Sequence, residues 1–314
     1  MISTHGSAAA KIILFGEHAV VYGQPAVGIP IQDVRASAAI SIDASVSSPI
    51  IEAKDLKVET TLGAASYPDS IAHIIKAIEL INEKIVKLPK SGWRLTIWSR
   101  IPIGRGLGSS AAISIAIIRA STKAMMKVIS PRELIKYSFE LEKIHHGTPS
   151  GIDNTVISLE KPILFRKDHE PAAIQSGSMF FVVGDTGISK KTADVVAQVA
   201  EAKEKNPEQY TRIFDQIGQI ARQGSLALKD GDAKRIGKLM DENQILLQRI
   251  NVSSPELENL IDAARTKGAL GAKLCGAGKG GCMVAVAKDG TAAGIIANEL
   301  MKAGAARSFT TKLK

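Results

Sequence analysis

Apolar and polar residues alternate in several short stretches of the chain, and this period of two is typical of a half-buried strand. Val34, Ala36, Ala38, Ile40 and Ile42 follow the pattern. Other short apolar runs are interpreted in the same way. Strands are predicted over residues 7–14, 34–42, 93 to just before 102, 163–166, 179–183, 282–287 and 306–313.

Other segments place apolar residues three or four positions apart, as one face of a helix requires. Residues 71–78 carry four isoleucines at this spacing. A capping box at Ser130–Glu133 and a similar signal at Ser253–Glu256 mark two helix starts. Helices are predicted over residues 70–86, 109–127, 131–146, 191–204, 207–229, 232–250, 255–267 and 291–303.

The order of these elements predicts the fold class. The first half of the chain mixes strands and helices, whereas the second half is mainly helical with a few strands. That order is typical of an α+β protein. We expect two lobes, formed by residues 1–175 and 176–314.

The sharpest candidate for a binding site is the glycine-rich segment Pro102–Ala112. Its glycines at 104, 106 and 108 permit unusual backbone conformations and let a ligand approach the main chain closely. A helix is predicted to start at Ser109, and the free N–H groups of a helix N-terminus favour an anion. Ser109–Ile118 carries no charged side chain, so this end is expected to be open only towards the loop. A tight turn without a ligand is the alternative.

Further along the same predicted helix, Arg119, Lys123 and Lys127 stand four residues apart. This spacing puts three side chains on one helix face. We expect them to form one solvated stripe, with the rest of the helix surface available for burial.

A second glycine-rich segment, Gly276–Gly281, formally matches the dinucleotide-binding pattern G-x-G-x-x-G. That pattern requires a helix after it and a long α/β unit around it. Here a strand is predicted next and the C-terminus is near, so a dinucleotide site is disfavoured. The segment is interpreted as a second anion-facing turn or as a packing turn.

Two single charges stand among apolar residues. Glu142 falls in the apolar arc of its predicted helix, flanked by Ile135 and Phe139, and Lys11 is the one charge in Ala8–Phe15. A buried carboxylate is costly unless it is paired or binds a metal. We expect Glu142 to face Mg²⁺ or a lysine, and Lys11 to face an acid or a phosphate. An edge position that reaches solvent is the alternative for both.

The segment Gly147–Asn154 is interpreted as a rigid loop, because glycine and proline surround its single charge, Asp153. Asp153 is either the cap of a turn or a functional carboxylate. Eleven residues separate it from Glu142, so the loop and the helix can present both acids to one ligand.

Composition narrows the classes of protein. Of 314 residues, 45% are hydrophobic and 23% charged, as in an ordinary globular protein, and the net charge is +9. A basic balance fits a nucleic-acid binder, a membrane-surface protein or an enzyme of anionic ligands. Scattered lysines and few aromatic residues disfavour a nucleic-acid binder.

Two cysteines, Cys275 and Cys282, cannot form a disulfide framework and are expected to be reduced and buried. With no apolar stretch long enough for a transmembrane helix, we expect a cytoplasmic protein.

Five segments together resemble the GHMP small-molecule kinases, and among them the members that act on mevalonate. They match in the order and spacing of that family. The segments are Ala10–Gly23, Pro102–Ala112, Glu142–Asn154, Gly184–Thr192 and Lys273–Cys282.

The resemblance implies a two-lobed GHMP kinase fold: a ribosomal protein S5 domain 2-like N-terminal lobe that binds ATP and a ferredoxin-like C-terminal lobe. It also implies an activity, the ATP- and Mg²⁺-dependent phosphorylation of the primary hydroxyl of (R)-mevalonate to 5-phosphomevalonate in isoprenoid biosynthesis. The implied partners are mevalonate and ATP, without nucleic acid or membrane. The oligomeric state stays open, a homodimer included.

The resemblance further implies roles for residues at matching positions. Asp153 and Lys11 would be catalytic, and Ser110 and Glu142 would hold Mg²⁺. Glu17, His18, Ser150 and Thr192 would bind the substrate. The residues implied to bind ATP are Gly104, Arg105, Gly106, Leu107, Gly108, Ser109, Ser110, Ala111, Gly276, Ala277, Gly278 and Gly280.

Three alternatives and three departures stay open. The chain could be another GHMP kinase, acting on phosphomevalonate or homoserine, a catalytically inactive ligand sensor on the same fold, or a nucleic-acid binder. Lys279 stands where relatives usually have glycine, and Cys275 where threonine is common. Arg105 is either a surface charge or a phosphate contact.

Overall fold

The computed structural model describes residues 3–146 and 150–313. The chain divides into two compact units. Unit 1 comprises Met1–Ala10, Val34–Pro102 and Gly108–Glu160, and unit 2 comprises Lys11–Asp33, Ile103–Leu107 and Lys161–Lys314. The long strands β1 (Ser3–Phe15) and β2 (Ala26–Ile42) each contribute residues to both.

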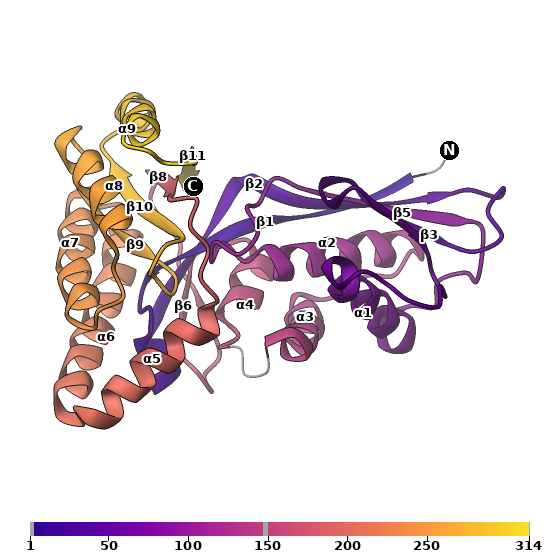
Figure 1. Cartoon of the computed structure of the whole chain (residues 1–314), viewed down its shortest axis with the longest axis horizontal. Coiled ribbons are helices and arrows are strands. Elements are labelled where there is room, and N and C mark those ends of the chain that lie inside the picture. The colour runs from indigo at the N-terminus through magenta and orange to yellow at the C-terminus, as the bar shows by residue number, and fades with distance from the viewer. Residues whose placement is uncertain (1–2, 147–149, 314) are drawn as a thin grey trace. The chain divides into compact units, whose positions relative to one another are not determined.

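Unit 1 contains a sheet covered by helices. Strand β5 (Trp93–Ser99) pairs antiparallel with the end of β2 and parallel with β3 (Ile50–Ala53), which pairs with β4 (Val58–Thr61). Figure 1 shows the helices on one face of these strands. They are α1 (Ala72–Leu80), α2 (Ser109–Ala124), α3 (Pro131–His146) and α4 (Ile152–Leu159).

The core of unit 1 follows the predicted alternation. Trp93, Leu95 and Ile97 of β5 are buried, while the residues between them are partly exposed. Helix α2 is apolar on nearly all sides, with every residue from Ala111 to Ile118 buried. A helix of that kind forms the centre of a core, because no face of it prefers water.

Unit 2 contains an antiparallel sheet in the order β11-β8-β10-β9. Helices α7, α8 and α9 pack against these strands, and α6 packs on α7 (Figure 1). The strands are β8 (Met179–Asp185), β9 (Gly271–Cys275), β10 (Cys282–Ala287) and β11 (Arg307–Leu313). The helices are α5 (Thr192–Lys205), α6 (Pro207–Asp230), α7 (Ala233–Arg249), α8 (Pro255–Thr266) and α9 (Gly290–Lys302).

Shorter elements complete the chain. In unit 2, β6 (Ile163–Phe165) pairs with the start of β2 and with β7 (Ala172–Ala173). Single helical turns are η1 (Ala19–Tyr22), η2 (Lys54–Leu56), η3 (Asp69–Ile71) and the π-type turn η4 (Ile81–Ile85). Within the described residues, no helix combines the length and the apolar character that crossing a membrane requires.

The predicted helix starts are confirmed where a capping residue was present. Ser130 Oγ accepts from the backbone N–H of Glu133 at 3.2 Å, and the Glu133 carboxylate accepts from the N–H of Ser130 at 3.0 Å. Ser254 Oγ accepts from the N–H of Leu257 at the start of α8. These bonds satisfy N–H groups that would otherwise lack a partner.

Four strands were missed in the sequence, β3, β4, β7 and β9, of which β7 has only two residues. Strands β3 and β4 have four residues each, too few to show a period. Strand β9 is buried along its whole length, so its sequence does not alternate. The predicted helix over 70–86 is also wrong in detail, because α1 ends at Leu80 and a π-type turn follows.

The predicted loop around Asp153 is wrong for its second half. Helix α4 begins at Ile152, so Asp153 lies in the first turn of a helix. Gly151 precedes that helix with φ 87°, a left-handed conformation that glycine adopts without strain. A carboxylate in the first turn is favoured by the helix dipole. Residues 147–149 of the predicted loop lie outside the described residues.

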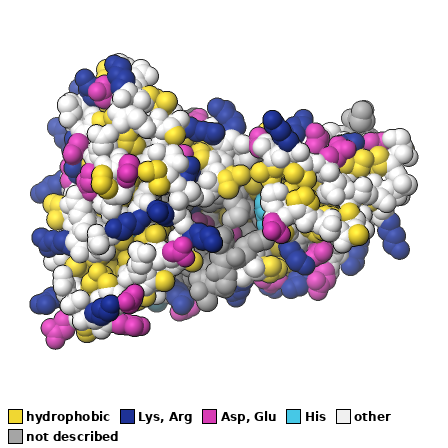
Figure 2. Space-filling model, viewed as in Figure 1, with side chains coloured by type: hydrophobic (Ala, Val, Ile, Leu, Met, Phe, Trp, Pro, Cys, Tyr) yellow, Lys and Arg dark blue, Asp and Glu magenta, His cyan; other side chains and the backbone are white. Residues whose placement is uncertain are grey.

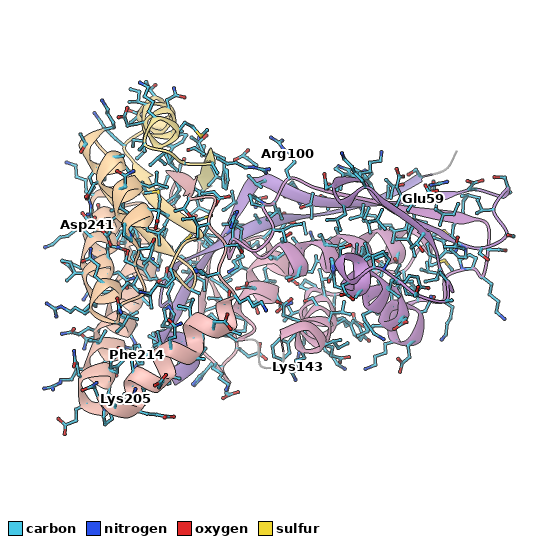
Figure 3. The ribbon with its side chains drawn as sticks, viewed as in Figure 1. Glu59, Arg100, Lys143, Lys205, Phe214 and Asp241 are labelled. Carbon is cyan, nitrogen blue, oxygen red and sulfur yellow. The ribbon has the colours of Figure 1, made fainter. Side chains whose placement is uncertain are left out.

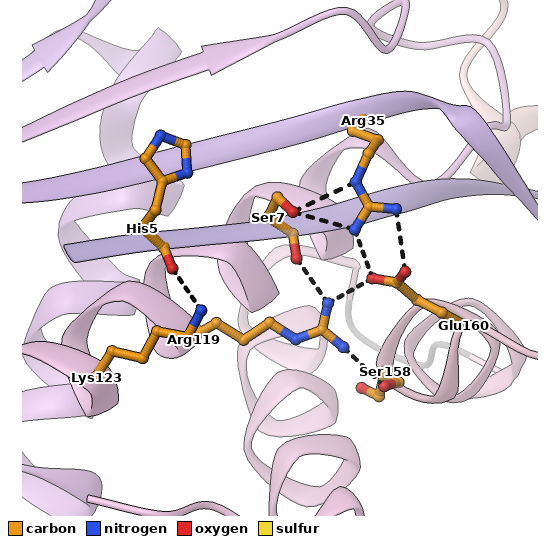
Figure 4. Close-up of polar contacts among 7 residues, drawn as sticks. All are labelled: His5, Ser7, Arg35, Arg119, Lys123, Ser158 and Glu160. Atoms are coloured by element: carbon orange, nitrogen blue, oxygen red, sulfur yellow. Dashed lines mark hydrogen bonds and ion pairs between the residues drawn. The ribbon is translucent and has the colours of Figure 1, made fainter. Parts of the chain in front are cut away.

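The predicted solvated stripe is confirmed at Lys123 and Lys127, which are exposed, whereas Arg119 is half-buried. All three side chains also bind backbone carbonyls of unit 1, and Figure 4 shows this for Arg119 and Lys123. Arg119 Nη1 donates to the carbonyl of Ser7 at 2.6 Å. Lys123 Nζ donates to His5 O at 2.9 Å. Lys127 Nζ donates to a backbone carbonyl after α1, that of Ile85.

Glu160 is the centre of this polar network (Figure 4). Arg35 donates to both of its carboxylate oxygens at 3.0 and 2.9 Å, and Arg119 Nη1 lies 2.5 Å from Oε1. Burial alone would raise the pKa of Glu160, but the hydrogen bonds from the two arginines outweigh it and lower the pKa. Arg119 also donates to the carbonyl of Ser158 in the last turn of α4. The network therefore fixes the end of α4 against α2 and β2.

We predict that Glu160→Gln lowers the free energy of unfolding by about 2 kcal/mol, because two arginines lose their anionic partner. Since folding lowers the pKa of Glu160, its contribution is present above the pKa of an unfolded glutamate, about 4.3, and is lost as pH falls below it. Urea unfolding at pH 7 and at lower pH measures both effects.

The matched control for this prediction is Glu79→Gln. Glu79 forms an exposed pair with Lys76 on α1, so its loss should cost less than about 0.5 kcal/mol. Equal destabilisation by the two substitutions at pH 7 would contradict the role given to Glu160.

Candidate active site

The N-terminus of α2 carries two serines directly after Gly108. Gly108 adopts φ 74°, and the helix begins at Ser109. Ser110 Oγ lies 3.4 Å from Oε2 and 3.5 Å from Oε1 of Glu142 on α3. Glu142 is 9% exposed, which excludes a carboxylate that reaches freely into solvent. Ser109 Oγ is buried and has no hydrogen-bond partner among the described residues.

This group of oxygens fits a divalent cation. Mg²⁺ prefers hard oxygen ligands and commonly takes only one or two from the protein, with phosphate and water supplying the others. The hydroxyl of Ser110 faces both oxygens of the Glu142 carboxylate at distances too long for strong hydrogen bonds. No cluster of three or more His, Cys, Asp or Glu that could hold a metal occurs in the part of the chain that the structure describes.

Asp153 lies on α4, which is fixed to α3. The side chain of Asn154 is buried and donates to the carbonyl of Ser138 on α3 at 2.9 Å. Ser150 is half-buried, and its Oγ is 3.5 Å from the N–H of Ile152 at the start of α4. Glu142 and Asp153 are therefore carried by two helices that pack on each other within unit 1.

In unit 2, Glu17 and Lys273 form a buried ion pair. Lys273 Nζ donates to Glu17 Oε1 and to the carbonyl of Leu274, and the two side chains are 1% and 0% exposed. Asn243 on α7 donates to the other oxygen of Glu17 at 3.4 Å. Burial raises the pKa of Glu17, while Lys273 opposes this shift. The pair joins the segment before η1 to the middle of β9.

His18 connects that segment to the second glycine loop, Gly276–Gly281. Its Nε2 is 2.9 Å from the carbonyl of Ala277, so Nε2 carries the proton of the neutral ring. Burial lowers the pKa of His18 to about 4. His18 also adopts φ 60°, a left-handed conformation that is uncommon for a residue with a side chain.

Three loops meet within unit 2: the first glycine loop (Gly104–Leu107), the second glycine loop and the β8 extension (Thr186–Ser189). Ser189 Oγ donates to the carbonyl of Gly104 at 3.1 Å. The N–H and Oγ1 of Thr186 both donate to Gly281 O at 2.9 Å, and Gly281 N–H donates to Ile188 O at 2.8 Å.

Lys11 lies beside the first glycine loop. Its backbone N–H donates to the carbonyl of Leu107 at 3.1 Å. The side chain is 2% exposed, which excludes the alternative of a lysine that reaches solvent at a strand edge. Its pairing with Asp153 stays a prediction.

The second glycine loop contains two positions that only glycine fits, Gly278 and Gly280. Gly280 has φ 125°, and a Cβ there would lie 2.8 Å from the carbonyl oxygen of Ile188. Gly278 has φ 82°, and a Cβ there would lie 2.0 Å from the carbonyl oxygen of Val252. Lys279, the departure noted in the sequence, donates from its backbone N to that same carbonyl at 2.7 Å. Its Nζ binds Asn251 Oδ1 at 3.3 Å.

The predicted site residues fall into two groups. Unit 1 brings together Ser110 and Glu142 and carries Asp153 and Ser150 on adjoining segments. Unit 2 brings together His18 and Ala277, and places Gly106 against Gly276. Thr192 is the first residue of α5 and is exposed.

Sequence reasoning missed three residues of unit 2: Lys273, Asn243 and Asp185. Lys273 is the one charge in an apolar strand, which is the same signal that identified Lys11. Asp185 ends β8 and is 2% exposed. Asn243 lies on an amphipathic helix, where a single buried amide gives no recognisable pattern.

The two cysteines lie in the core of unit 2. Both are free and buried, as predicted. Burial raises the pKa of Cys275 to about 12 and that of Cys282 well above its ordinary value. A thiol with so high a pKa stays protonated near neutral pH, and the thiolate is the reactive form.

Two family models match the sequence of this chain. The model described as "GHMP kinases N terminal domain" matches residues 72–161, and "GHMP kinases C terminal" matches residues 226–306. The chain belongs to the GHMP kinase family. The family resemblance and the fold class predicted from the sequence are therefore confirmed.

One curated relative and two solved structures similar to this GHMP kinase are each named mevalonate kinase. Mevalonate kinase of Pyrococcus abyssi is 38% identical over 300 residues, which cover 90% of this chain and 88% of that protein. The structure of L. major mevalonate kinase in complex with R-mevalonate has a TM-score of 0.85 and 31% identity, covering 100% of this chain and 96% of that one. The Methanococcus jannaschii mevalonate kinase has a TM-score of 0.87 and 28% identity, covering 100% and 99%.

We predict that Lys273→Met destabilises this GHMP kinase by about 3 kcal/mol, because Glu17 is left buried without its counter-charge. The double variant Lys273→Met with Glu17→Gln should recover a large part of that loss, since no unpaired charge remains. Urea unfolding of the three proteins measures the effect.

Lys205→Met is the matched control. Lys205 is labelled in Figure 3 and forms an exposed pair with Glu201 on α5, so its loss should cost less than about 0.5 kcal/mol. A double variant less stable than Lys273→Met would contradict the pairing.

Proposed function

We propose that this chain transfers the γ-phosphoryl group of ATP to the primary hydroxyl of (R)-mevalonate and releases 5-phosphomevalonate and ADP. The observation that carries the proposal is the pair of Ser110 and Glu142 at the N-terminus of α2, directly after the first glycine loop. A glycine loop followed by a helix N-terminus suits a polyphosphate, and the paired oxygens suit its cation. The curated relatives named mevalonate kinase support the acceptor.

The nucleotide is held by two loops in this proposal. The backbone of Gly104–Ala111 wraps the phosphates, and Gly276, Ala277, Gly278 and Gly280 support them from the second glycine loop. Ser110 and Glu142 hold Mg²⁺, which neutralises phosphate charge when it is bound. Phosphoryl transfer depends on positioning and charge neutralisation more than on covalent chemistry with the protein.

The acceptor is activated by Asp153. Its carboxylate orients the primary hydroxyl and takes the hydroxyl proton as the oxygen bonds to the γ-phosphorus and the bond from that phosphorus to ADP breaks. Lys11 pairs with Asp153 and lowers the pKa of the hydroxyl. Asp153 is well suited to a fixed position because α4 is held near both ends, by the hydrogen bond from Asn154 to Ser138 O and by the Glu160 network.

The remaining predicted roles belong to the same proposal. Glu17, His18, Ser150 and Thr192 lie near the bound mevalonate, and His18 acts there as a neutral ring because its pKa is about 4. We assign ATP binding to an N-terminal lobe of residues 1–175 and keep residues 176–314 as the C-terminal lobe. The protein acts in the cytoplasm, as a monomer or a homodimer.

The alternatives are less well supported. A sensor needs none of Lys11, Ser110, Glu142 and Asp153, yet all four are present. A nucleic-acid binder would concentrate its positive charge, whereas Figure 2 shows basic side chains spread over the visible face among acidic ones. Phosphomevalonate or homoserine as the acceptor is not favoured, because the curated relatives reported above are named mevalonate kinases.

The experiment is an ADP-release assay with Mg²⁺-ATP and four acceptors: mevalonate, phosphomevalonate, homoserine and galactose. We expect turnover with mevalonate and a product whose mass has increased by one phosphoryl group. Turnover confined to another acceptor would assign the chain to a different GHMP kinase activity. ATP binding without turnover on any acceptor would favour the sensor.

We predict that Asp153→Asn lowers kcat by about a hundredfold or more, because the amide cannot take the hydroxyl proton. The KM for ATP should change little and the protein should remain folded. Steady-state kinetics and circular dichroism measure these effects. Asp194→Asn is the control, since Asp194 is also an acid in the first turn of a helix. A kcat near that of the unaltered protein would remove Asp153 from this role.

We predict that Glu142→Gln raises the Mg²⁺ concentration needed for half-maximal activity by about tenfold, because a cation ligand loses its charge. Titration of activity with Mg²⁺ at saturating ATP measures this shift. Glu140→Gln is the control on the same helix, where Glu140 binds Lys84. An unchanged Mg²⁺ requirement would leave Glu142 with a structural role.

A further inference from the structure

Arg105, whose role the sequence left open, is bound within unit 2. Its Nε lies 3.1 Å from Oδ1 of Asp185, and its Nη2 donates to the carbonyl of Gly187 at 2.7 Å. The side chains of Arg105 and Asp185 are 17% and 3% exposed. Nη1 is buried and has no hydrogen-bond partner among the described residues. The guanidinium is therefore held through Nε and Nη2 and is not a freely solvated surface charge.

Asp185 is a rigid partner for this arginine. It is the last residue of β8, and its backbone carbonyl accepts from the N–H of Ala306 at 2.8 Å. Its Oδ1 also accepts from the N–H of Gly187 at 2.9 Å. The carboxylate is thus fixed by the sheet on one side and by the turn of the β8 extension on the other.

The first glycine loop needs such a restraint. Gly104 and Gly106 both have φ near +70°, and glycine segments lose much conformational freedom when they become ordered. Two contacts hold the loop to the β8 extension: the guanidinium of Arg105 and the hydrogen bond from Ser189 Oγ to Gly104 O. The arginine provides the charged one.

We propose that Arg105 and Asp185 form a latch that holds the first glycine loop in its nucleotide-binding conformation before ATP arrives. Arg105 is then a positioning residue, and the loop backbone makes the phosphate contacts. The inference rests on the proposed function, because it takes ATP as the ligand of this loop. A loop that is already ordered loses less entropy on binding, so the latch lowers the KM for ATP.

The latch also balances charge. Asp185 alone would place a buried negative charge beside a loop that receives a polyanion. The guanidinium neutralises it through a close ion pair, which retains strength because both groups are largely shielded from water. An uncharged pair at these positions would remove the repulsion but would not restore the restraint on the loop.

The test compares Arg105→Gln, Asp185→Asn and the double variant in the full-length protein. Steady-state kinetics give kcat and the KM values for ATP and mevalonate, and titration with ATP alone gives the nucleotide Kd. We expect Arg105→Gln to raise the KM and Kd for ATP by about tenfold, the loss of one charge-assisted contact. The KM for mevalonate should stay within about twofold, because the latch acts on the nucleotide loop.

The double variant, Arg105→Gln with Asp185→Asn, provides the decisive measurement. If the two residues act through each other, the double variant binds ATP no more weakly than Arg105→Gln. It also lacks an uncompensated buried acid, so it keeps the test valid where Arg105→Gln alone folds poorly. Arg105→Lys should recover part of the affinity, since an ammonium can pair with Asp185 without also holding Gly187.

Arg265→Gln is the matched control. Arg265 likewise bridges a carboxylate and a backbone carbonyl in unit 2, binding Asp241 of α7 (labelled in Figure 3) at 2.6 Å and Ala272 O at 3.1 Å. The Arg265→Gln substitution should lower the Tm of the protein without changing its KM for ATP.

Three results would overturn the latch: an unchanged Kd for ATP in Arg105→Gln, losses of the two single variants that add in the double variant, or an equal rise in the KM for mevalonate. Failure of the proposed function is a separate result. If the unaltered protein phosphorylates no acceptor, the ATP titrations of the variants still decide whether the latch exists.

Discussion

The buried ion pair between Glu17 and Lys273 is the interaction on which the site in unit 2 depends. It joins residues 256 positions apart in sequence, in a place where neither charge can reach water. Such a pair is tolerated only when its geometry is close, because both groups lose their hydration. The ion pair connects the turn after β1 to β9, and the neighbouring His18 connects the same turn to Ala277 in the second glycine loop.

Much of the fold was predictable because long elements show their period clearly. Helices α3, α6, α7 and α8 have one apolar face, α3 and α8 also have the two start signals found in the sequence, and β5 alternates along its length. Strands β3 and β4 were not predictable, since four residues cannot establish a period. Helix α4 was hidden because the sequence of Pro149 and Gly151 also fits a turn, and the packing of α4 on α3 is not visible in the sequence.

The candidate site was predictable where a single charge stood among apolar residues. That signal identified Glu142 and Lys11, and both are buried. The same signal was present at Lys273. The sequence could not reveal the partners of these charges, because each ion pair or hydrogen bond joins segments that only the fold brings together. Arg105 illustrates this limit: its chemistry allowed a phosphate or solvent, and its partner proved to be an acid at the end of β8.

The close approach of Gly278 to Val252 has a consequence for how this loop can vary among related proteins. No side chain fits at position 278, since its first carbon would overlap the Val252 carbonyl. Position 279 differs, because Lys279 already occupies a left-handed conformation with its side chain on Asn251. In the second glycine loop, position 279 can therefore carry a side chain and position 278 cannot. The two neighbouring positions look equivalent in the glycine-rich sequence.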